Sequence, residues 1–237
     1  MTFLEMQTDA LDLLQELQNH PQYSVTKLKQ YLNRGSVAFV RKTKCIEGTI
    51  NITTVSDQFE YTETDEATLV SIYLPYQFRY VVGTEVGDIL KPYPGGYTNL
   101  PKTYQYGTPA FYWIRNLHSK STTDPATTIG VRVGTWPIAH VADVTLRIDA
   151  FLWPTTMVEN TATPEYKDAW HDAPVYYAVA RFFGTFSHLR PAWREKAATY
   201  MNEFERLVAE AHSEMMVQSD EPIEIEDVYG QMDKWDY

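Results

Sequence analysis

The residues best suited to chemistry in this chain lie in one short stretch that follows Pro164. Asp168, His171 and Asp172 come within five residues of one another, directly before an apolar run. A histidine with two carboxylates can bind a metal or exchange protons with a substrate, so one hypothesis is a metal-dependent hydrolase. The spacing differs from the pair of histidines four residues apart that forms the common helical zinc site.

The same residues can also be explained as the start of a helix. We expect Asp172 to cap a helix that begins at Ala173, with Pro174 in its first turn. Asp168 and His171 would then bond to nearby backbone groups or to each other. Additional metal ligands would have to come from histidines that follow no recognisable spacing: His20, His118, His140, His188 and His212. We therefore interpret the stretch as a helix start and expect no catalytic site, no metal and no cofactor.

Other signs of catalysis are weak. The sequence has no Gly-x-Ser-x-Gly, no phosphate-binding loop and no dinucleotide-binding glycine motif. Tyr112 and Trp113 could stack on sugar rings, which leaves a sugar-binding β-module as an alternative to a half-buried strand. Cys45 has no identifiable histidine partner, so we expect a packed thiol. We predict a protein that is not an enzyme.

Composition limits the possible partners. The chain of 237 residues has a net charge of −11, which argues against wrapping around nucleic acid. A single cysteine rules out an intrachain disulfide and fits synthesis in a reducing cytoplasm. No apolar run is long enough to span a bilayer, and the first residues lack the pattern of a signal peptide. We therefore expect no contact with a membrane.

The elements that must position these residues form three blocks. Apolar residues spaced by three and four predict a helix over 3–17 with one apolar stripe: Phe3, Met6, Ala10, Leu13 and Leu17. A second helix is predicted from the cap Ser24 to about Phe39. Alternation then predicts strands from 48 to 82, a long loop over 83–108 and three more strands up to 153. Two further helices follow, one after Pro164 and one that begins at Pro191. The predicted apolar face of the helix after Pro164 consists of Val175, Val179, Phe182, Phe183 and Phe186.

This order predicts an α+β fold, because helices and strands are segregated along the chain. The simplest arrangement is a four-helix bundle made from the N-terminal and C-terminal helix pairs, with an inserted antiparallel β-module. The predicted divisions are 1–47 and 161–216 for the helix pairs, 48–160 for the β-module and 217–237 for an extended arm. Gly35 falls inside the second helix, where it indicates close approach of another backbone.

The last residues are acidic and yet carry large apolar groups. Seven carboxylates accompany a lone Lys234 in 217–237, so this segment cannot form a core of its own. A solvating tail does not need the apolar side chains that alternate with the acids and follow them. We interpret the segment as an arm that orders on a partner, with a frayed terminus as the alternative. The expected contact residues are Ile223, Ile225, Val228, Tyr229, Trp235 and Tyr237.

The second predicted helix is locally basic. A solvated helix face explains such residues, and so does a cationic patch that accepts an acidic partner. That partner would be the acidic arm of a neighbouring copy or a different protein. The residues are Lys27, Lys29, Arg34, Arg41, Lys42 and Lys44.

Three stretches together resemble the head-to-tail adaptor (connector) proteins of tailed bacteriophages. The first is 3–43, which is similar to that family's opening helix pair and includes the Leu-Asn-x-Gly run at 32–35. The second is "YGTPAFYWIRN" with the later "VADVTLRIDAFLWP", and the third is the final helix pair from Pro164 onward. The longer loop at 83–108 and the acidic, aromatic arm depart from the family's pattern.

The resemblance implies a structural protein of the virion neck. Such proteins form a ring, commonly of about twelve copies, beneath the portal protein, and they extend the DNA channel. The ring offers a platform to the tail or nozzle protein, and DNA passes through without specific binding. An acidic wall would suit this role, because like charge repels phosphate. The alternative within the same particle is a tail-completion or tail-tube protein.

Overall fold

A computed structural model describes residues 1–15, 24–62, 65–82, 85–94, 105–115, 131–139 and 144–218 of the chain. Its helices are α1 (Phe3–Leu13), α2 (Val25–Thr43), α3 (Asp172–Thr185) and α4 (Pro191–Gln218). Two short 3-10 helices are η1 (Ala67–Ser71) and η3 (Asp168–Trp170). The strands are β1 (Glu47–Thr53), β2 (Glu60–Tyr61), β3 (Ile72–Val82), β4 (Glu85–Ile89), β5 (Lys91–Pro92), β6 (Tyr106–Gly107), β7 (Phe111–Arg115), β8 (Arg132–Trp136), β9 (Ile138–Ala139) and β10 (Thr145–Leu152).

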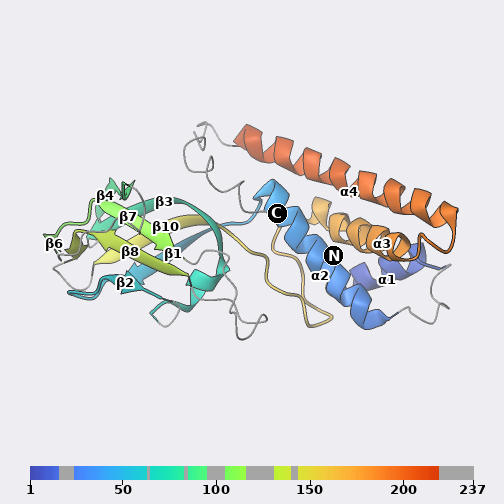
Figure 1. The fold of residues 1–237 in the computed structure, drawn as a ribbon, viewed down its shortest axis with the longest axis horizontal. Coiled ribbons are helices and arrows are strands. Elements are labelled where there is room, and N and C mark those ends of the chain that lie inside the picture. The colour runs from blue at the N-terminus through green and yellow to red at the C-terminus, as the bar shows by residue number, and fades with distance from the viewer. Residues whose placement is uncertain are drawn as a thin grey trace.

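The strands gather at one end of the long axis and the helices at the other, as Figure 1 shows. The protein is therefore α+β, as the segregated order of the elements predicts. α2 leads directly into β1, and the chain returns to the helical end after β10.

Local signals explain where the helices begin and end. Thr2 caps α1 through its side-chain oxygen, and the Glu5 carboxylate accepts a hydrogen bond from the Thr2 backbone in return. That hydrogen bond lowers the pKa of Glu5. α2 begins after Ser24 and ends at Lys44, which adopts the left-handed conformation with φ of 55°. α4 begins at Pro191, the first-turn position that favours proline.

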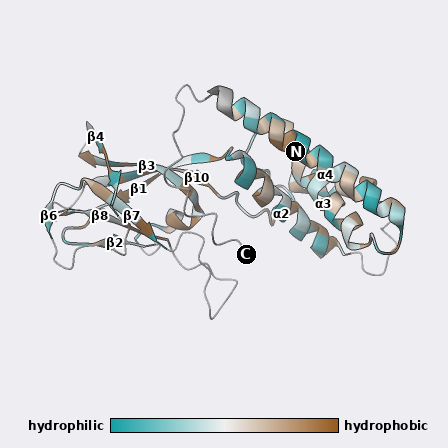
Figure 2. Ribbon diagram, turned by 45° about the horizontal axis from the view of Figure 1, so that its top comes forward, coloured by the Kyte–Doolittle hydropathy of each residue, from teal (hydrophilic) through white to brown (hydrophobic). Residues whose placement is uncertain are grey.

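α3 is the central helix of the helical end, since it contacts α1, α2 and α4. More than half of its residues are buried. α2 and α4 carry a mixture of hydrophobic and hydrophilic residues along their length (Figure 2). The predicted apolar face of α3 is confirmed, because its members are all buried: Val175, Val179, Phe182, Phe183 and Phe186. In α1 the predicted stripe is wrong at Leu13, which is exposed, while its neighbour Leu14 is fully buried.

Two four-stranded sheets form the strand end. The first has the order β1-β10-β3-β4 and the second the order β2-β8-β7-β5. Their facing residues share one apolar core, with contributions from β1, β3 and β10 on one side and β2 and β8 on the other. The chain crosses from one sheet to the other at both edges, from β1 to β2 and from β4 to β5. Both edges of this sandwich are therefore joined by a short stretch of chain.

Two parts of the strand end differ from the expectation. The predicted loop over 83–108 contains β4, β5 and β6, and the expected strand around 67–71 begins as the 3-10 helix η1. The β5–β7 and β6–β9 pairs are parallel, whereas all other pairs are antiparallel among the described strands. Gly87 interrupts the side-chain alternation of β4, so the strand was not predicted. A Cβ there would lie 2.0 Å from the Tyr80 carbonyl oxygen, at the register shift between β3 and β4.

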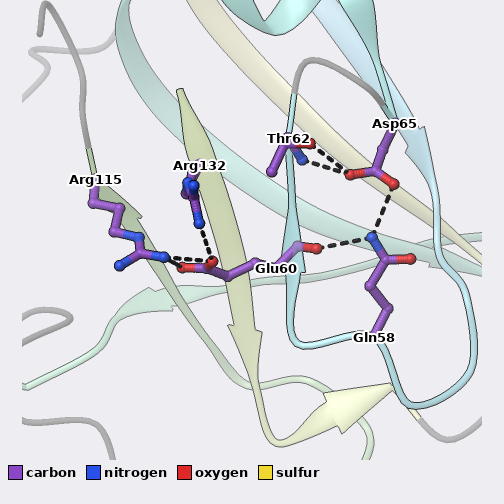
Figure 3. A network of polar contacts seen from close by, with 6 residues as sticks. All are labelled: Gln58, Glu60, Thr62, Asp65, Arg115 and Arg132. Carbon is purple, nitrogen blue, oxygen red and sulfur yellow. Dashed lines mark hydrogen bonds and ion pairs between the residues drawn. The ribbon is translucent and has the colours of Figure 1, made fainter. Parts of the chain in front are cut away.

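A polar network fastens the edge of the second sheet (Figure 3). Arg115 on β7 and Arg132 on β8 are register partners, and the Glu60 carboxylate on β2 pairs with both, at 2.5 and 3.2 Å. One carboxylate thus bridges two guanidinium groups and offsets part of the repulsion between them across the ladder. The adjoining turn is held by Asp65: partial burial raises its pKa, but hydrogen bonds from Gln58 and Thr62 outweigh this and lower it.

Candidate docking groove

A groove of about 640 Å³ lies between α2, α3 and β3, where the helical end meets the strands. The part of the lining that α2 contributes includes cationic and apolar side chains. Tyrosines and one further arginine from the other elements complete the lining. The lining residues are Asn33, Arg34, Val37, Ala38, Arg41, Lys42, Tyr73, Tyr177 and Arg181.

The sequence of α2 places this wall on one side of the helix. Counted from Arg34, the positions 34, 37, 38, 41 and 42 follow the steps of three and four that define one helical face. The buried residues Leu28, Leu32 and Phe39 pack on the opposite side, against the other helices and the 166–170 segment. Arg34, Arg41 and Lys42 therefore stay outside the core and line the groove.

Close packing next to the groove fixes how α2 sits on α3. A Cβ on Gly35 would lie 2.8 Å from the Cα of Pro174, so the two backbones approach as closely as a glycine permits. This confirms the predicted reason for a glycine within the helix. Asn33 adds a polar clamp: its amide donates to the Met157 carbonyl at 3.0 Å and accepts from the Met157 N–H at 2.8 Å.

The charges that line the groove are only partly neutralised within the described residues. Lys42 forms an ion pair of 2.5 Å with Glu205 of α4. Arg34 and Arg181 form no ion pair with any carboxylate of the described ranges; each guanidinium lies 6.0 Å from a tyrosine ring, those of Tyr31 and Tyr177 respectively. Such a surface offers both charge for an anion and apolar area for aliphatic or aromatic side chains.

The structure brings together three of the six cations predicted as a patch. Arg34, Arg41 and Lys42 line the groove. Lys29 points its ammonium toward the ring of Phe3 at 5.8 Å, and Lys44 lies at the same distance from the ring of Phe151. Lys27 is exposed two turns before Arg34 on the same side of α2, and it does not line the groove. Whether an acidic partner binds there stays a prediction.

Sequence reasoning missed the contributions of α3 and β3 to this site. Tyr177 and Arg181 are four residues apart on α3, a spacing that places them on one face of a helix that was itself predicted. A basic residue within an otherwise apolar stretch was the available signal. Tyr73 gave none, because only the packing of β3 beside α2 makes it a neighbour. The predicted contact residues of the arm, Ile223 to Tyr237, lie outside the described residues.

The stretch around His171 is the start of a helix, with one correction to the expected cap. Asp172 is the first residue of α3 and His171 occupies the N-cap position, so Asp172 is not the cap. The short 3-10 helix η3 precedes α3 and moves the boundary by one residue. His171 Nε2 donates to the Tyr166 carbonyl at 2.9 Å, and its Nδ1 lies 3.4 Å from the Asp168 carboxylate.

The groups next to His171 also form contacts that hold the start of α3 in place. The Met1 ammonium donates to His171 Nδ1 at 3.0 Å, so the start of the chain is held against the start of α3. The Tyr166 hydroxyl pairs with Ser36 at 3.1 Å, and burial raises its pKa, which keeps the phenol neutral. Within the described ranges, no three His, Cys, Asp or Glu side chains come together in a group that could hold a metal ion.

Packing restricts access to the other candidate residues, which are Tyr112, Trp113 and Cys45. Trp113 is 3 % exposed, which leaves its ring no free face for a sugar, and one face of the Tyr112 ring is covered by Phe78, with centroids 3.7 Å apart. Burial raises the pKa of the Cys45 thiol, which disfavours the reactive thiolate. None of the helices in the described part of the chain combines the length and apolar character that crossing a membrane requires.

Comparison with known proteins identifies the relatives of this chain. A family model described as SU10 adaptor protein matches residues 1–225, which include all the described helices and strands. A search of curated proteins found no match. The family match agrees with the resemblance carried by the two helix pairs and the aromatic-rich strands. The chain belongs to the SU10 adaptor protein family, whose members are phage adaptor proteins.

Proposed function

We propose that this protein forms a ring beneath the portal of a tailed phage, where it extends the DNA channel and gives the tail or nozzle its attachment platform. The observation that carries the proposal is the family match over residues 1–225. The burial of His171, a candidate for metal or proton chemistry, and of Trp113, a candidate for sugar stacking, is consistent with a structural role.

In this proposal the helices work as one four-helix bundle (1–47 and 161–216) and the β-rich module (48–160) is an insertion. α3 supports this division, because it contacts each of the other three helices. The apolar cores support it too, since the residues of the two sheets form a cluster of their own. The protein would then act in the neck of the virion after synthesis in the host cytoplasm.

The net charge of −11 suits a conduit for DNA. Repulsion between carboxylates and phosphates lets a duplex pass along a wall without sticking to it. The ring would have about twelve copies, and each contact between neighbours would join two different surfaces.

Imaging the neck of the intact particle tests the proposal directly. We expect this protein in a closed ring of about twelve copies between the portal and the tail. A position elsewhere in the tail would favour a tail-completion or tail-tube protein, and absence from the particle would overturn both assignments.

A second experiment tests the role of the arm. Deleting residues 218–237 removes the acidic, aromatic segment and leaves the buried residues of all four helices in place. We expect an unchanged melting temperature and weaker assembly on purified portal rings, measured by co-sedimentation. Normal assembly of the truncated protein would show that the arm is not needed.

A further inference from the structure

The groove between α2, α3 and β3 has both cationic side chains and an apolar surface, and each favours a different kind of group in an occupant. Its cations call for carboxylates, since Arg34 and Arg181 have no ion pair within the described residues. Its surface also includes Val37, Ala38, Tyr73 and Tyr177, which favour apolar or aromatic side chains. A phosphate or a small anion would satisfy only the first of these.

We propose that the occupant is the chain's own C-terminal segment, residues 219–237. That segment has seven carboxylates against one lysine and includes the run Ile223 to Tyr229, in which two isoleucines alternate with acids. The arginines and the apolar groups are interleaved on the walls of the groove, because Arg34 shares a helix face with Val37 and Arg181 shares one with Tyr177. A segment that carries isoleucines and glutamates side by side can therefore offer apolar groups to Val37 and Tyr177 and carboxylates to the two guanidinium groups.

The length of the segment allows this contact. The groove borders α4 through the Lys42–Glu205 ion pair, and α4 ends at Gln218, which is about 20 Å further along the helix. A stretch of 19 extended residues spans about 60 Å, so it can return to the groove of its own copy or reach that of a neighbour. The inference concerns this contact alone and does not depend on a ring or on a portal.

Disulfide trapping tests the contact in the full-length chain. Cys45 is replaced by serine, and cysteines are introduced at Val37 in the groove and Ile225 in the segment. The matched control has Val70 in place of Val37: both valines are exposed, at 39 and 46 %, but Val70 lies on η1, which does not line the groove. We expect the V37C–I225C pair to oxidise at least about tenfold faster than the V70C–I225C pair, as expected for a docked segment with a raised local concentration.

The product also tells which copy supplies the segment. An intramolecular bond gives a monomer with altered mobility on a non-reducing gel, and an intermolecular bond gives a dimer; each supports the proposal. Equal oxidation rates for the two pairs would overturn it and leave the groove to a different acidic protein. Equal trapping rates would leave the family assignment unchanged. Absence of a ring from the particle would likewise leave the trapping result unchanged.

Charge reversal separates specific docking from chance collision. Arg34→Glu with Arg181→Glu should slow trapping about tenfold, because two ion pairs become repulsive. Adding Glu224→Lys and Glu226→Lys should restore the rate, since the charges are then exchanged. Unchanged circular dichroism must accompany each variant, and a rate insensitive to both sets of substitutions would contradict an electrostatic contact.

Discussion

Two pairs of arginines, one pair at each end of the molecule, differ in whether a carboxylate meets them. At the strand end, the Glu60 carboxylate pairs with both Arg115 and Arg132, and Arg147 pairs with Asp149 at 3.0 Å. At the helical end, Arg34 and Arg181 line a groove without an ion pair in the described part of the chain. Ionic groups that are satisfied internally hold a fold together, whereas unsatisfied ones are available to a partner. The difference points to the helical end, beside the sheets, as the place where a partner segment docks.

The largest expected effect concerns whether the two ends are separate units. Phe78 and Phe182 are both fully buried, but they belong to different apolar clusters. Each substitution by alanine should cost about 3–5 kcal/mol of unfolding free energy. Hydrogen exchange should rise in the sheets for Phe78→Ala and in α1 and α3 for Phe182→Ala. If either variant raises exchange at both ends equally, the comparison fails and the protein unfolds as one unit.

A pair of helical glycines gives a smaller and sharper test of the helical end. Gly35→Ala should cost about 1–3 kcal/mol, because the new methyl group meets the Pro174 backbone at 2.8 Å. Gly184→Ala is the matched control: its nearest neighbour would be 4.0 Å away, so it should stabilise α3 by about 0.5–1 kcal/mol. Urea unfolding measures both, and a gain in stability for Gly35→Ala would show that the close approach of α2 and α3 is wrong.

The smallest effect tests the charge contrast itself. Glu60→Gln leaves two arginines facing each other across β7 and β8, and it should cost about 1–2 kcal/mol. Glu203→Gln removes a carboxylate from an exposed pair on α4, where Arg206 keeps Glu210, so the cost should be about 0.5 kcal/mol or less. Thermal unfolding compares the two variants. Equal losses would mean that the internal pairing at the strand end contributes no more than a surface ion pair.

Much of the fold could be predicted because it rests on local signals. The burial of the apolar face of α3, Pro191 at the start of α4 and the close approach at Gly35 all follow from spacing or residue type. The strand β4 was missed because Gly87 and the neighbouring turn residues conceal its alternation. Its existence depends on pairing with β3, which no local pattern reports.

The site was predictable only in part for the same reason. Arg34, Arg41 and Lys42 follow from one helical face of α2. Arg181 and Tyr73 join them through tertiary packing between segments far apart in the chain. Lys29 and Lys44 do not line the groove, and their ammonium groups lie near the rings of Phe3 and Phe151.

The order of strands in the first sheet has a consequence for how the protein could be altered. β1 and β10 are the first and last strands of the β-rich part, and they are adjacent, with Glu47 opposite Phe151. The hundred or so residues between them leave and rejoin the helical end through two neighbouring antiparallel strands, as a single hairpin would. A short turn joining these two strands would therefore bridge the same gap, so this part of the chain can be exchanged as a cassette while α2 and α3 keep their separation.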